Sequence, residues 1–216
     1  MGLSISTGTL SFLRSEDPDG CESFRRQLDE VNRLLRSNGL PEHHEPAILP
    51  RLQSRFTHIG QPYSWLHYLR RAVAHAMEGC TQLEPLGAEE DPIADPLYDS
   101  VLFSFASHLV CHSDCEGFYV PVDFLEPLYD DLPSGDEHCI LGGILGSSQG
   151  AMRELIHVAP LLDIPVEKGK LSDQQFARIE NECTERSPFW IERLVWLKFF
   201  EQARLSIEYR TAISFG

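Results

Sequence analysis

The chain has 216 residues, of which 42% are hydrophobic and 24% charged, a composition typical of a folded globular protein and not of a disordered one. Its 18 basic and 33 acidic side chains give a net charge of -15 at pH 7, which argues against a protein that grips nucleic acid through phosphates. The strongest apolar run, residues 101–111, covers about half of the roughly 20 residues that a membrane span needs, so we expect no membrane helix.

Six cysteines are scattered through the sequence: Cys21, Cys80, Cys111, Cys115, Cys139 and Cys183. A chain of this length can build a hydrophobic core without disulfides. The N-terminal residues lack the basic and apolar regions of a secretion signal. We therefore expect reduced thiols and a cytoplasmic location.

The first half of the chain shows three helical patterns. Asp17 and Pro18 predict the start of a helix that ends at Asn38-Gly39. Residues 40–60 carry three prolines and no periodicity, which predicts a long surface connection. Pro62 opens a second helix that ends at Gly79, and Asp95-Pro96 begins a third over about residues 97–112.

The second half combines strand and helix signals. Residues 118–124 are rich in aromatic and β-branched side chains with period-two character, and Pro121 predicts that this strand lies at a sheet edge. Residues 139–145 resemble a second strand, after which Ser147 or Ser148 caps a helix that stops at Pro160.

Two further helices complete the pattern. Ser172 and Gln175 form a capping box for a helix to about residue 186, and the last helix begins at Ser187-Pro188. The tail, residues 211–215, is expected to pair as a strand with residues 117–124 or with the N-terminal segment.

These elements predict a single globular domain over residues 1–216 of the α+β class, mainly helical, with about six helices and a small sheet of two to four short strands. The aromatic side chains of two helices would suit a homodimer contact, but the pattern is equally that of a core.

The acidic charge is concentrated in the middle of the chain. Residues 72–152 contain 15 carboxylates and no Lys or Arg, whereas the other residues carry 18 acids and 18 bases. Such a segment is expected either to form a solubilising surface or to dock a basic protein partner. For docking, the predicted contact residues are Glu89, Glu90, Asp91, Asp130 and Asp131.

A second hypothesis is a metal site. On a helix, His108, Cys111, His112 and Cys115 would share one face, and imidazole and thiolate are good zinc ligands. One helix cannot close a tetrahedron, so His138 and Cys139 are the expected donors from elsewhere. The competing interpretation is a structural helix end, and no cofactor is expected in that case.

A third hypothesis is a serine hydrolase that uses Ser148. Residues 146–150 match the Gly-x-Ser-x-Gly nucleophile elbow between a strand and a helix. His157, the one histidine downstream of Ser148, would lie on the helix that the elbow starts and could not reach back. A serine-capped helix start explains the same residues.

Residues 63–71 place aromatic, imidazole and guanidinium groups on one helix. Such a set can line a pocket for an anion. The alternative is that Trp65, Tyr68 and Leu69 pack in the core while Arg70 and Arg71 pair with the excess carboxylates.

Three stretches, residues 1–6, 63–71 and 117–124, resemble those of a family of uncharacterised bacterial proteins of similar length. The resemblance covers most of the chain. It implies a bacterial, cytosolic, single-domain protein, and it supplies no activity, ligand or catalytic residue. The favoured function is therefore an acidic interaction module, of the regulator or toxin-antidote type, with metal binding as its alternative.

Overall fold

The computed structural model describes residues 4–56, 61–87 and 89–215. Within these ranges it contains seven α-helices and a five-stranded sheet, so the fold is α+β and mainly helical, as the sequence predicts. The sheet has five strands instead of the predicted two to four. Met1 to Leu3, part of the resemblance, and the end of the predicted 40–60 connection lie outside the described residues. No helix in the described ranges has the length and hydropathy required to cross a bilayer.

The sheet joins distant parts of the chain. Its strands are β1 (Ile5–Thr7), β2 (Gly117–Val120), β3 (Leu128–Tyr129), β4 (Ile144–Ser147) and β5 (Ile213–Phe215), in the order β1-β5-β2-β4-β3. Strands β2 and β4 are parallel, and the other neighbours are antiparallel. The C-terminal strand therefore pairs with both of its predicted partners, β2 and the N-terminal β1.

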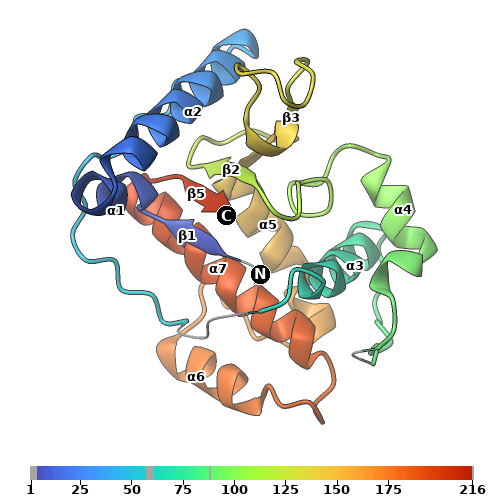
Figure 1. Cartoon of the computed structure of the whole chain (residues 1–216). Helices are drawn as coiled ribbons and strands as arrows, with labels where there is room; N and C mark the ends of the chain where they lie inside the picture. Colours follow the sequence, from blue (N-terminus) through green and yellow to red (C-terminus); the bar gives the residue numbers. More distant parts are fainter. Residues whose placement is uncertain (1–3, 57–60, 88, 216) are drawn as a thin grey trace.

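The helices cover both faces of this sheet (Figure 1). They are α1 (Thr9–Glu16), α2 (Pro18–Ser37), α3 (Trp65–Met77), α4 (Pro96–Leu102), α5 (Ser148–Val158), α6 (Asp173–Glu182) and α7 (Trp190–Tyr209). Phe118 and Val120 of β2 pack with α2, whereas Tyr119 packs on the opposite face with α5 and α7. Because side chains alternate along a strand, β2 needs apolar residues in both registers and is buried throughout.

Local capping explains several helix ends. Asp17 accepts a hydrogen bond from the Gly20 amide at the start of α2, and Asp95 accepts one from Leu97 at the start of α4. Ser147 caps α5, and Ser172 with Gln175 forms the predicted capping box of α6. These four predicted helix starts are confirmed.

Other predictions need correction. The helix expected over residues 97–112 ends at Leu102, and residues 103–116 form turns. The strand expected at 118–124 ends before Pro121 and lies in the centre of the sheet, so Pro121 stops the strand without placing it at an edge. The second strand begins only at Ile144, and α1 was not predicted.

Candidate partner-binding surface

Most carboxylates of the acidic segment, residues 72–152, face solvent. Twelve of the 15 are exposed: Glu78, Glu84, Glu89, Glu90, Asp91, Asp99, Glu116, Asp123, Glu126, Asp131, Asp136 and Glu137. In Figure 1 the exposed stretches follow the right and upper sides of the molecule, from the loop before α4, through α4, to the loop around β3.

The other three carboxylates are held by arginines. Asp95 accepts hydrogen bonds from Arg71 Nε and His75 Nε2, each at 2.7 Å, and Asp114 pairs with Arg70. Although burial opposes the charged form, the bonds from His75 and Arg71 lower the pKa of Asp95. The predicted pairing of Arg70 and Arg71 with excess carboxylates is therefore confirmed, as is the burial of Tyr68 and Leu69. Trp65 is half-buried against Trp190.

Asp130 is the third of these inward carboxylates. Its side chain is 1% exposed, pairs with Arg33 at 2.7 Å and accepts the amides of Leu132 and Ile140. This corrects its predicted place among the contact residues, because a carboxylate consumed by these donors has no free face for a partner. Its function is to fix the turn after β3 against α2.

The remaining predicted contact residues, Glu89, Glu90, Asp91 and Asp131, are exposed. The first three lie in the loop before α4, where the Tyr68 hydroxyl of α3 donates to the carbonyls of Gly87 and Glu90 at 3.0 and 2.8 Å. Asp91 also accepts the Ile93 amide at 3.0 Å. The bonds from Tyr68 tie the backbone to α3 at Gly87 and at Glu90, beside the exposed carboxylates.

The second exposed acidic group, Asp131, Asp136 and Glu137, lies beside α2. There Arg33 donates to the carbonyl of His138 at 3.0 Å, and His138 Nδ1 lies 2.9 Å from Glu30 Oε1. The bond with Glu30 raises the pKa of His138. The sequence pattern missed this contribution of α2, since Glu30 and His138 are separated by 108 residues.

The predicted metal-binding cluster is not on one helix face. His108 lies in a turn, where its Nδ1 accepts the Ser147 amide at 3.2 Å and its Nε2 donates to the Leu125 carbonyl at 3.1 Å. Both nitrogens are therefore occupied in the neutral ring. Burial lowers the pKa of His108 to about 4, so the ring has no proton to gain near neutral pH and no lone pair to offer a metal.

The other predicted donors are also dispersed. Both ring nitrogens of His112 face carbonyl oxygens, those of Ser113 and Phe118, at 3.1 Å. Cys111 and Cys139 point their thiols at backbone carbonyls, whereas Cys115 and His138 are exposed. Among the described residues there is no group of three or more His, Cys, Asp or Glu side chains that could hold a metal ion. The geometry thus gives the zinc hypothesis no support.

Ser148 is not arranged as a nucleophile. It is 0% exposed, and its hydroxyl lies 2.7 Å from that of Ser206 on α7. His157 donates from Nε2 to the Ala76 carbonyl at 2.9 Å. The elbow hypothesis is therefore corrected, because the serine is sealed in the core and the downstream histidine is bonded elsewhere.

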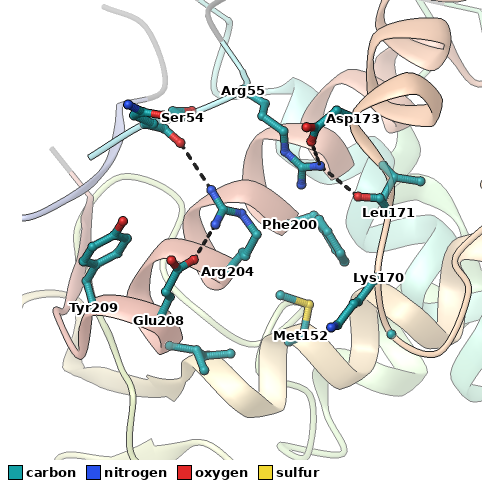
Figure 2. A pocket seen from close by; sticks show the side chains of 13 residues that line it. Ser54, Arg55, Met152, Lys170, Leu171, Asp173, Phe200, Arg204, Glu208 and Tyr209 are labelled. Atoms are coloured by element: carbon teal, nitrogen blue, oxygen red, sulfur yellow. Dashed lines mark hydrogen bonds and ion pairs between the residues drawn. The ribbon is translucent and has the colours of Figure 1, made fainter. Parts of the chain in front are cut away.

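A large open pocket is lined by residues of α5, α7 and the segments around residues 53–55 and 169–173 (Figure 2). It has a volume of about 800 Å³, and Met152 and Phe200 form part of its apolar wall. Arg55 and Arg204 at its rim both bond the fully buried Glu201, at 2.8 and 2.7 Å. Arg55 also pairs with Asp173 at 3.1 Å and Arg204 with Glu208 at 2.5 Å. Because these three carboxylates balance the two guanidinium groups, the pocket offers little free positive charge to an anion. The sequence pattern gave no sign of the pairing of Arg55 with Glu201 across 146 residues.

The family comparison agrees with the distribution of charge. A family model described as "Putative DNA-mimic protein" matches residues 1–215, and the chain belongs to this family. No curated protein and no solved structure matches the chain.

Proposed function

We propose that this protein is an acidic interaction module that takes the place of DNA on the nucleic-acid-binding surface of a basic protein. The observation that carries the proposal is the segment 72–152, which has no Lys or Arg and exposes twelve carboxylates. The family description points in the same direction.

The chemistry of DNA recognition supports this function. Proteins hold DNA mainly through Lys and Arg contacts to its closely spaced phosphates. The guanidinium fork that binds a phosphate also binds a carboxylate in a bidentate manner. A fixed array of carboxylates can therefore engage the same basic side chains, and its field accelerates the encounter.

The contact surface that we propose contains Glu89, Glu90 and Asp91 in the loop before α4 and Asp131 after β3. All four are exposed, and the Tyr68 hydroxyl ties the backbone beside the first three to α3 at Gly87 and Glu90. Preorganisation of this kind favours binding because little conformational entropy is lost on association.

The test uses the immobilised full-length chain and the DNA-binding proteins of an extract of the cells that express it, prepared by elution from duplex DNA resin. A variant with Glu89, Glu90, Asp91 and Asp131 changed to Lys should lose the protein that the wild type retains. The matched control changes Glu16, Glu22, Asp19 and Glu167, which are exposed outside the segment, to Lys. Equal loss in both variants, or retention in both, would contradict the proposed surface.

A further inference from the structure

Among the described residues of the acidic segment, six large apolar side chains are exposed, and three of them are more than half exposed. Phe103 is 69% exposed, Phe105 57% and Leu125 85%. We call these three residues the apolar patch. Exposure of apolar side chains of this size to water is unfavourable, and the free energy falls when a partner covers them.

Two turns carry the patch, and hydrogen bonds tie these turns together. The Tyr129 hydroxyl donates to the Phe105 carbonyl at 3.1 Å, and the two rings contact edge to face with centroids 5.5 Å apart. On the other side His108 Nε2 donates to the Leu125 carbonyl at 3.1 Å. The turn after α4 and the turn before β3 are therefore held against each other, at the right and upper part of Figure 1.

The backbone of Phe105 is strained. Its φ is 58°, in the left-handed region that a bulky side chain rarely adopts. Strain of this kind persists only where the surrounding contacts impose it, and it concentrates at functional positions. Here it keeps an aromatic ring at the surface.

The charges around the patch are acidic. Asp99 precedes it on α4, Asp123 and Glu126 flank Leu125, and Asp131 follows β3. Two arginines contact this region, and both are paired: Arg153 with Asp123 and Arg33 with Asp130, each at 2.7 Å. A second copy of the chain would bring like charges together, whereas a basic protein would find complementary charge.

DNA-binding surfaces are not only basic. Many carry apolar or aromatic side chains that contact thymine methyl groups, stack on bases or wedge between base pairs. An acidic protein that replaces DNA on such a surface needs an apolar area beside its carboxylates to cover those side chains.

We propose that the apolar patch receives an apolar side chain that stands among the Lys and Arg residues of the partner's DNA-binding surface. This inference rests on the proposed function and narrows the partner to DNA-binding proteins that use apolar contacts to bases. The carboxylates attract basic proteins in general. The apolar patch favours those basic proteins whose DNA-binding surface also carries an exposed apolar side chain.

The experiment uses two labelled synthetic peptides of equal length and charge, in which Lys alternates with Leu in one and with Ser in the other. Fluorescence anisotropy measures their binding to the full chain at about 0.15 M salt. We expect the Lys/Leu peptide to bind about tenfold more tightly than the Lys/Ser peptide. This preference should disappear in the variant Phe103→Ser with Leu125→Ser.

The matched control is Phe12→Ser with Ile48→Ser, which removes side chains that are 65% and 79% exposed outside the acidic segment. It should retain the preference. Should the patch variant fail to fold by circular dichroism, Leu125→Ser alone serves, because that side chain is the most exposed of the three.

The outcomes separate the two proposals. An unchanged preference in the patch variant would overturn the patch while leaving the acidic surface intact. A wild-type dimer that becomes monomeric in the patch variant, as seen by sedimentation, would overturn it as well, because the patch would then be a contact between copies. If Lys/Ser binding also survives the four charge reversals, the proposed function itself fails.

Discussion

Gly146 and Gly150, the glycines of the elbow-like motif, are required by two buried rings. A Cβ at Gly146 would collide with the Tyr119 ring, and one at Gly150 would collide with the His108 imidazole. The spacing of Gly and Ser in the sequence is that of a catalytic motif, but the reason for it is close packing. The sequence does not distinguish the two because the rings come from residues about 30 to 40 positions away.

Substitution of Gly150 tests this explanation. In an ordinary helix position, Gly→Ala stabilises by about 1 kcal/mol. Here the collision with His108 should reverse the sign, and we expect Gly150→Ala to destabilise by about 1–3 kcal/mol in urea unfolding. Gly87→Ala is the control, since its Cβ would meet only the end of the exposed Glu90 side chain, at 3.2 Å. A stabilised Gly150→Ala variant would contradict the packing.

The buried histidines make a second prediction, on pH. Burial lowers the pKa of both His108 and His112 to about 4, against 6.5 for a free imidazole. Between pH 4 and pH 6.5 these two histidines are protonated in the unfolded chain but remain neutral in the folded chain. The stability that each ring contributes is therefore present above pH 6.5 and lost as the pH falls through about 4.

Imidazole resonances in NMR spectra provide the measurement. The two rings should keep their neutral shifts from pH 8 to pH 5, whereas His138, whose pKa is raised by Glu30, should protonate first. Titration of His108 or His112 together with or before His138 would be inconsistent with the buried hydrogen bonds.

At the scale of elements, the short α4 shows where local patterns fail. Apolar periodicity and the Asp95-Pro96 start favour a helix that continues to residue 112. Instead the carboxylate of Glu154 on α5 accepts the amides of His108 and Leu109 at 2.6 and 2.9 Å and the Ser107 hydroxyl at 2.8 Å. The two amides thus bond to a side chain from another helix instead of to carbonyls of the preceding turn, as they would in a continued helix. The local sequence does not reveal this tertiary contact.

Glu154 yields a third prediction. Burial raises its pKa to about 7 despite the three donors. Its folded pKa exceeds the unfolded value of 4.5, so its contribution to stability is complete below pH 4.5 and is lost as the pH rises through about 7. The Gln variant does not titrate and serves as the reference. The free energy of unfolding of the wild type, relative to that of Glu154→Gln, should be larger at pH 5 than at pH 8 by on the order of 2 kcal/mol.

Urea unfolding of both proteins at the two pH values measures this difference, and effects common to both proteins cancel. Glu154→Ala, which leaves two amides unpaired, should destabilise by about 2–4 kcal/mol at either pH. A pH-independent difference between wild type and Glu154→Gln would show that Glu154 does not titrate in this range.

Caps, prolines and periodicity thus predicted most of the helices, because those signals act within a few residues. The predicted edge position of β2 was wrong, because β2 becomes central when β5, from the opposite end of the chain, pairs with it. Pro121 is a local signal for the end of a strand, and it carries no information on the neighbours of that strand.

At the scale of the whole molecule, segregation of charge was visible in the sequence, since it needs only counting. Which carboxylates are exposed was not visible. Asp130 and Asp131 are adjacent, yet one is closed by Arg33 and the other faces solvent. The burial of Asp130 depends on Arg33, which is 97 residues away in the sequence. The sequence can therefore locate a partner surface to a segment, but only the structure identifies the side chains that form it.

The charge difference predicts how association depends on salt. A basic DNA-binding protein retained by the chain should associate about tenfold more slowly with the variant that carries Lys at 89, 90, 91 and 131, at low salt. The difference should shrink at about 1 M salt, where charges are screened within a few ångströms. Stopped-flow kinetics measure both rates, and a salt-independent difference would point to lost packing instead of lost attraction.

The most direct measurement of the central claim is competition with DNA. A labelled DNA duplex bound to that retained protein is titrated with the full-length chain while the anisotropy of the label is followed. If the chain occupies the DNA-binding surface, it should release the duplex completely, and excess unlabelled duplex should in turn displace the chain. Formation of a ternary complex, in which the duplex stays bound while the chain binds as well, would contradict DNA mimicry.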